Sequence, residues 1–118
     1  MRHSSWVGAG AASLILLFLL ILPSYALDRC NDYIADVKIQ HYKYFGIDFP
    51  YHYGVAQLEA ESRCRPNVTA KDKGMGIGQF MPATWKGIKD QLGEPDLDPY
   101  NPEHAIKAQA FFMWQIHK

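Results

Sequence analysis

The chain has 118 residues, and its twelve Lys and Arg side chains balance twelve Asp and Glu, so its formal net charge is zero. This balance argues against a nucleic-acid-binding protein, which carries a basic surplus or a basic stripe. An aromatic content of 14% argues against a disordered acidic or basic tail. The length allows one small domain.

The N-terminus has the pattern of a secretory signal peptide. Arg2 precedes an uncharged, largely apolar run over residues 7–22, and the small residues Ser24 and Ala26 occupy the positions before a cleavage site. The run is shorter than the roughly 20 apolar residues that a bilayer span requires. We therefore expect residues 1–26 to be removed on export to the periplasm or the cell exterior. The alternative is an uncleaved anchor, which would be the chain's only contact with a membrane.

Removal of the signal peptide leaves residues 27–118 as one predicted domain. A domain of this size is marginally stable on its hydrophobic core alone. Its two cysteines, Cys30 and Cys64, would enter a compartment that permits disulfides. We expect them to form a disulfide, and two buried free thiols are the alternative.

Proline and glycine residues divide this domain into helices and irregular segments. The expected helices run from Asp28 to about Phe45, from Tyr51 to about Ser62, from Pro82 to Gly93 and from about Glu103 onward. The segment 67–80 has three glycines at alternate positions, and the segment 94–102 has three prolines, so neither is expected to be helical. No alternating apolar pattern of convincing length is present. The predicted class is all-α, with a little irregular strand at most.

The sequence has no pattern that predicts a metal site or a cofactor. The five histidines are scattered, and neither an HExxH nor a paired CxxC motif occurs. Asp96, Asp98, Asn101 and Glu103 could supply oxygen ligands, but prolines interrupt them and the register of a calcium loop is absent. We interpret this stretch as a capped turn.

Two glutamates near the end of the second expected helix are candidates for acid–base chemistry. Glu59 and Glu61 are two positions apart, so about 200° of helical rotation separates them and they cannot act as a pair. One can be solvated while the other faces the glycine-rich segment. A carboxyl group beside apolar groups has its charged form disfavoured, which suits a general acid. Two surface glutamates are the simpler alternative.

The stretch from Gln57 to Trp85 resembles the lytic transglycosylases of the SLT, goose-lysozyme-like group. That family has a helix ending in Glu-Ser, a proline a few residues later, a Gly-x-x-Gln segment and a Met-Pro-x-Thr segment. These correspond here, without a gap, to Glu61-Ser62, Pro66, Gly76-Ile77-Gly78-Gln79 and Met81-Pro82-Ala83-Thr84. The resemblance extends over about residues 45–117 and is greatest to small exported or phage-encoded members.

The resemblance implies a lysozyme-like α fold and a peptidoglycan substrate. It implies cleavage of the β-1,4 bond between N-acetylmuramic acid and N-acetylglucosamine, with a 1,6-anhydro product. Glu61 would be the only catalytic acid and base, oriented by Ser62, while Glu59 would remain a surface residue. The implied substrate-binding residues are Ser62, Gly76, Ile77, Gly78, Gln79 and Phe80.

Two features depart from the family pattern. Gly78 stands where the family usually has methionine, and the chain ends at Lys118, where the family continues to an Ala-Tyr-Asn-Ala-Gly motif. The tyrosine of that motif contacts the catalytic glutamate in the family. We therefore expect a C-terminally short domain that lacks one wall of the cleft. We also expect exposed apolar side chains that a protein partner could cover, namely Phe111, Phe112 and Trp114.

Two alternative functions remain open at this point. One is a muramidase that hydrolyses the same bond, with Asp48 or Asp72 positioning a water molecule. The other is a catalytically silent protein that binds peptidoglycan without cutting it.

Overall fold

The computed structural model describes residues 29–118. The predicted signal peptide lies outside the described residues. Within them, no helix combines the length and the apolar character that crossing a membrane requires.

The described residues form helices joined by irregular segments, which confirms the predicted all-α class. The named helices are α3 (Ile34–Phe45), α4 (His52–Ser62), α5 (Pro82–Leu92) and α6 (Pro102–His117). The glycine-rich segment between α4 and α5 contains two isolated β-bridges, Thr69 with Met75 and Met75 with Phe80. These bridges are the small amount of irregular strand that the sequence allowed.

The helix ends follow the proline and glycine signals closely. Gly93 ends α5 with φ +67°, a left-handed conformation that glycine adopts without steric cost. Asn101 caps α6, because its side-chain oxygen accepts the backbone N–H groups of Glu103 and His104. The acidic stretch before α6 is therefore the capped turn that the sequence predicted. The first helix is shorter than expected, because a turn separates Cys30 from the start of α3.

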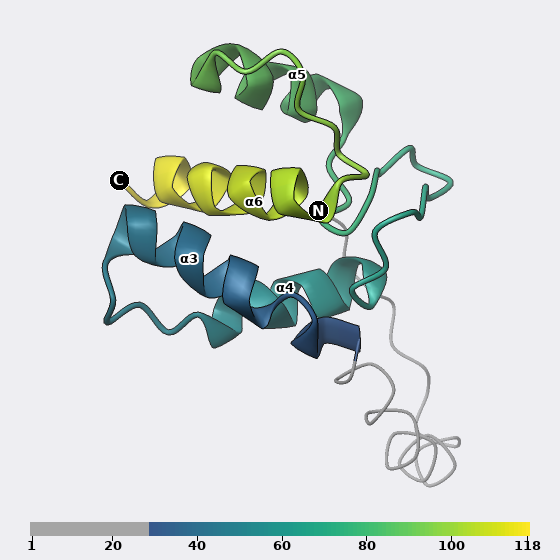
Figure 1. Cartoon of the computed structure of the whole chain (residues 1–118). Helices are drawn as coiled ribbons and strands as arrows, with labels where there is room; N and C mark the ends of the chain where they lie inside the picture. The colour runs from purple at the N-terminus through teal and green to yellow at the C-terminus, as the bar shows by residue number, and fades with distance from the viewer. Residues whose placement is uncertain (1–28) are drawn as a thin grey trace, which may run out of the picture.

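Helix α6 is the central element of the fold. Figure 1 shows α5 on one side of α6 and the pair α3 and α4 on the other. Ala105 and Ile106 belong to a core shared with α3 and α4, whereas Ala108 and Phe111 belong to a second core shared with α5. Because α6 is apolar on both sides, it holds the two cores in one unit.

Phe111 corrects one expectation, since it is buried and only 7% exposed. Its ring lies 5.9 Å from that of Tyr44, centroid to centroid, because α3 packs along α6. Phe112 and Trp114 are half-buried and pack against the same core. The large exposed apolar surface that the sequence predicted here is therefore mostly covered by the domain itself.

The predicted disulfide between Cys30 and Cys64 is present. Both cysteines are buried in the core that also contains Leu58 and Ile106. The bond joins positions 34 residues apart and fastens the segment before α3 to the residue two positions after α4.

Replacing Cys30 and Cys64 with serine is expected to lower the free energy of unfolding by about 3–4 kcal/mol, because the unfolded chain regains the entropy of an open loop. Urea denaturation of the oxidised wild type and of the variant measures this difference. Two alkylatable thiols in the oxidised, unreduced wild type would contradict the assignment.

Candidate active site

The carboxyl end of α4 places Glu61 at the start of a sharp change in chain direction. Glu61 and Ser62 are the last two residues of the helix, and Arg63 and Cys64 follow with φ of 56° and 57°. Two consecutive non-glycine residues in the left-handed region stop the helix at this point. The backbone N–H of Arg63 still donates to the carbonyl oxygen of Glu59 at 2.8 Å.

Ser62 fastens this helix end to the glycine-rich segment. Its Oγ lies 2.8 Å from the carbonyl oxygen of Ile77 and 3.2 Å from that of Leu58, and it accepts the backbone N–H of Arg65. Ser62 is buried, so water does not compete with these bonds. The neighbouring Glu61 is consequently held beside the segment that contains Ile77.

Hydrogen bonds within the glycine-rich segment hold its backbone in place. Gly76 has φ +72° and donates its backbone N–H to the carbonyl oxygen of Val68 at 2.8 Å. The side-chain Nε2 of Gln79 donates to the carbonyl oxygen of Gly76 at 2.9 Å. A Cβ at position 76 would collide with the carbonyl oxygen of Pro99, so the chain can pass here only as glycine.

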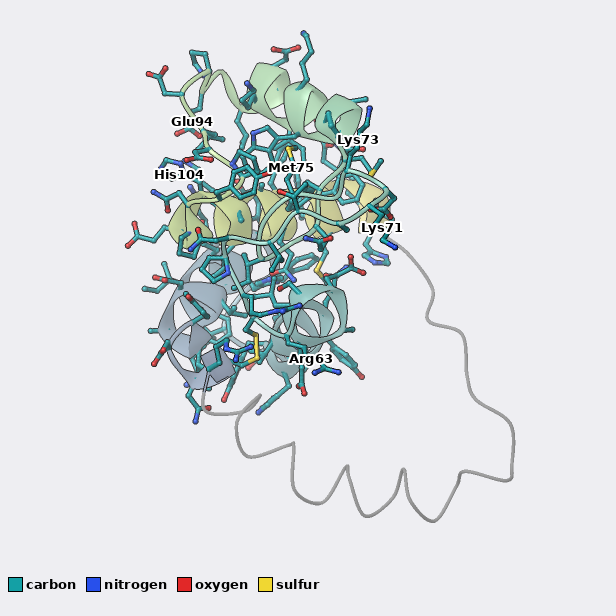
Figure 2. All side chains as sticks on the ribbon, turned by 90° about the vertical axis from the view of Figure 1, so that its right-hand side faces the viewer. Arg63, Lys71, Lys73, Met75, Glu94 and His104 are labelled. Carbon is teal, nitrogen blue, oxygen red and sulfur yellow. A yellow bond between two sulfur atoms is a disulfide. The ribbon has the colours of Figure 1, made fainter. Side chains whose placement is uncertain are left out.

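The glycine-rich segment has two exposed lysines, and its Met75 side chain packs against the hydrophobic core. Figure 2 shows Lys71 and Lys73 near one edge of the domain, with Met75 further inside. Both lysines are exposed, whereas Met75 packs against the core between α5 and α6. The backbone N–H and carbonyl groups of Met75 and Phe80 bond reciprocally at 3.0 and 3.2 Å, which closes the turn that contains Gly78.

A pocket opens where α4, the glycine-rich segment, α5 and α6 meet. Its lining residues are Gln57, Leu58, Gly78, Gln79, Phe80, Met81, Thr84, Gln109, Phe112 and Met113. Glu61 is one helical turn beyond Gln57, on the same face of α4. Glu61 is half-buried, and its Oε2 atom is shielded from solvent. A partly desolvated carboxyl group beside an apolar pocket is the arrangement that suits a general acid.

The structure divides the predicted substrate-binding residues into two groups. Gly78, Gln79 and Phe80 line the pocket. Ser62, Gly76 and Ile77 are buried behind it and shape the backbone that supports it.

Gly78 leaves room for an aromatic ring at the pocket. A Cβ at this position would come within 2.6 Å of the ring of Phe80. The Phe80 ring thus packs against the space that a side chain at position 78 would occupy.

Several pocket residues have no motif by which the sequence could have identified them. Gln57 and Gln109 are 52 residues apart, and their side chains are hydrogen-bonded at 3.0 Å. Phe112 and Met113 reach the pocket because α6 runs through the middle of the domain. Among residues 29–118, no group of His, Cys, Asp and Glu side chains is arranged to hold a metal ion.

A largely buried polar network includes two of the pocket-lining residues, Gln57 and Gln109. The Nε2 of His41 is 3.0 Å from the Oε1 of Gln109. The side-chain Nε2 of Gln109 donates to the carbonyl oxygen of Gly54 and to the Oε1 of Gln57. The His41 ring is fully buried and stacks on Phe49 with centroids 5.3 Å apart. Burial lowers the pKa of His41, and the hydrogen bond with Gln109 opposes this with a smaller effect. His41 is therefore neutral at pH 7.

The family model of the Transglycosylase SLT domain matches residues 38–118. The match covers α4, the glycine-rich segment, α5, α6 and most of α3, and so includes every residue of the pocket. The chain belongs to the SLT transglycosylase family, whose members act on peptidoglycan. No curated protein and no solved structure matches the chain significantly.

Replacing Gly76 with alanine is expected to lower the free energy of unfolding by at least about 2 kcal/mol, because the new Cβ meets the Pro99 carbonyl in a left-handed backbone. Gly87→Ala is the matched control. Gly87 lies in α5 with no neighbouring atom in the way, so alanine there is expected to stabilise by up to about 1 kcal/mol. Thermal unfolding of both variants tests this, and equal effects would contradict it.

The depressed pKa of His41 predicts a loss of stability in acid. The unfolded chain takes up a proton at the ordinary histidine pKa of 6.5, and the folded chain does so only at lower pH. The stabilisation is therefore complete above about pH 6.5 and declines as the pH falls toward the folded-state pKa. His41→Gln removes this titration, so its unfolding free energy should change less between about pH 5 and 7. The same pH dependence in both proteins would refute the interpretation.

Proposed function

We propose that the chain is a peptidoglycan lytic transglycosylase in which Glu61 is the only catalytic acid and base. It cleaves the β-1,4 bond between N-acetylmuramic acid and N-acetylglucosamine. The observation that carries this proposal is the bond between the Ser62 hydroxyl and the Ile77 carbonyl oxygen, which fixes Glu61 beside the glycine-rich segment. Membership of the SLT family supports the substrate class.

In the proposed reaction, the Glu61 carboxyl group acts first as a general acid and then, as a carboxylate, as a general base. Protonated Glu61 donates its proton to the glycosidic oxygen as the bond from that oxygen to C1 of the muramoyl sugar breaks. The resulting carboxylate then accepts the proton of the muramoyl 6-hydroxyl, whose oxygen attacks C1. The products are a free 4-hydroxyl on N-acetylglucosamine and a 1,6-anhydro muramoyl end. Glu61 regains its proton, and no water is consumed.

The positions of the two aspartates support this reaction over hydrolysis. A hydrolytic enzyme with two carboxyl groups needs the second one at the scissile bond to activate water or to act as nucleophile. Asp48 is exposed in the connection between α3 and α4, and the Oδ1 of Asp72 accepts the backbone N–H of Gly74 at 3.1 Å. Both aspartates are exposed, whereas the Oε2 of Glu61 is shielded from solvent.

The proposed site of action is the cell envelope, after export of the chain. The peptidoglycan substrate lies there, and the predicted signal peptide over residues 1–26 would direct the chain to it. The disulfide between Cys30 and Cys64 is consistent with an oxidising compartment.

Glu61→Gln is expected to lower the release of soluble fragments from purified sacculi at least about 100-fold, because the amide can neither donate nor accept the required proton. Glu59→Gln is the matched control, since it is two positions away on another face of α4 and should retain the wild-type rate. Fragment release measured as the loss of sacculus turbidity and as the absorbance of the soluble fragments gives both rates. Equal rates for the Glu61 variant and the wild type would reject Glu61 as the catalytic group. Binding to sacculi without any fragment release from the wild type would instead favour a silent binding module.

A further inference from the structure

Positive charge is concentrated in one short stretch of a chain that is neutral as a whole. Residues 63–73 contain four of the twelve Lys and Arg side chains and one of the twelve Asp and Glu, a local excess of three positive charges. The four basic residues are all exposed, namely Arg63, Arg65, Lys71 and Lys73. Figure 2 shows Lys71 and Lys73 on the edge opposite Glu94 and His104, with Arg63 below them. We call Arg63, Lys71 and Lys73 the basic edge.

Lys71 and Lys73 lie at the tip of a hydrogen-bonded turn. The backbone N–H of Lys73 donates to the carbonyl oxygen of Ala70 at 2.9 Å, and the N–H of Ala70 donates to that of Gly74, also at 2.9 Å. Lys73 has φ +76°, a left-handed conformation that costs free energy for lysine and none for glycine. A long charged side chain therefore stands where the backbone favours glycine. Strain of this kind points to a role for the lysine beyond folding.

This turn lies against the pocket. A Cβ at Gly74 would come within 2.7 Å of the Oε1 of Gln79, which lines the pocket. The next residue, Met75, exchanges both backbone hydrogen bonds with Phe80, another lining residue. Two residues of chain span at most about 7 Å, and residues paired in this way have Cα atoms about 5.5 Å apart. The Cα of Lys73 is thus within roughly 13 Å of that of Phe80.

We propose that the basic edge binds the carboxylate groups of the peptide stems of peptidoglycan, so that the preferred substrate is the peptide-bearing glycan and not the bare sugar chain. This inference rests on the proposed function, because it names the substrate class of the same site. The stem is joined to the lactyl group of N-acetylmuramic acid and has free carboxylates. Lysine and arginine bind carboxylates through charge-assisted hydrogen bonds.

The length of a stem matches the distance from the pocket to the basic edge. A stem of three or four residues spans about 10–14 Å when extended, so its carboxylates reach Lys73 while the sugar occupies the pocket. The turn is closed by its own hydrogen bonds, so the two lysines are held on a fixed backbone before the substrate arrives.

Two forms of one substrate test the proposal. Lys71→Gln combined with Lys73→Asn removes two charges, and asparagine tolerates the left-handed backbone. The KM of this lysine variant on soluble stem-bearing strands is expected to rise about tenfold at about 0.05 M salt and to approach that of the wild type at about 0.5 M, where exposed charges are screened. On the same strands stripped of stems by an N-acetylmuramoyl-L-alanine amidase, the two proteins should have equal KM.

The matched control removes the same charge elsewhere. Lys43 is in the last turn of α3 and Lys118 follows α6, and Figure 1 shows these helix ends on the side of the domain away from the glycine-rich segment. Lys43→Gln combined with Lys118→Gln should leave KM unchanged on both substrates. The melting temperature of the lysine variant is expected to equal or exceed that of the wild type, so a raised KM does not reflect unfolding.

A binding measurement separates this inference from the proposed function. In the non-cleaving Glu61→Gln chain, adding the two lysine substitutions should raise the Kd for stem-bearing fragments about tenfold by calorimetry. An unchanged Kd, or an equal rise for stripped fragments, would overturn the inference whether or not the wild type cleaves. A wild type that binds stem-bearing fragments through these lysines and releases no product would overturn the proposed reaction alone.

Anionic lipids are the other source of negative groups at the cell envelope. The wild type and the lysine variant should sediment equally with vesicles made of equal parts phosphatidylglycerol and phosphatidylcholine. Sedimentation that depends on Lys71 and Lys73, together with equal Kd values for stem-bearing and stripped fragments, would assign the basic edge to a membrane surface and overturn the inference.

Discussion

The structure of the site depends on the way the carboxyl end of α4 is held from two sides. The Ser62 hydroxyl bonds to the Ile77 carbonyl oxygen at 2.8 Å, and two residues later the Cys64 disulfide fastens the chain to Cys30. From the first anchor to the second, the backbone passes through two left-handed residues, Arg63 and the disulfide-bonded Cys64. This conformation costs free energy, and the two anchors stabilise it. The position of Glu61 relative to the glycine-rich segment follows from these constraints. In a small domain, a disulfide and a hydrogen bond close together in the sequence can hold the proposed catalytic carboxyl group in place.

The structure of the site also depends on helix α6. Its buried residues serve two cores, and between those cores the helix contributes Gln109, Phe112 and Met113 to the pocket. Its one buried polar side chain, Gln109, lies where three helices meet and bonds to both α3 and α4. Apolar packing and the hydrogen bonds of Gln109 therefore both hold helix α6 in place. Because α6 belongs to both cores, the pocket cannot change shape without disturbing them.

The helices and the position of Glu61 could be predicted from the sequence because the signals for them are local. Pro82, Gly93 and the residues before α6 mark helix ends within a few positions, and Glu61 was located by the spacing of one continuous motif. The burial of Phe111 and the bonds of Gln109 could not be predicted in this way. Both depend on α3 and α6 lying side by side, which brings together residues more than 50 positions apart. The family resemblance implied that Ser62 and Ile77 contact the substrate, and the structure shows both residues buried and joined by a hydrogen bond that no local sequence signal could have predicted.

The proposed function requires that a single carboxyl group complete the reaction without water. Mass spectrometry of the fragments released from purified sacculi tests this most directly. We expect muropeptides with 1,6-anhydro muramoyl ends and no uptake of solvent oxygen from ¹⁸O-labelled water. Reducing muramoyl ends that carry the ¹⁸O label would contradict it, because they require water as the attacking group.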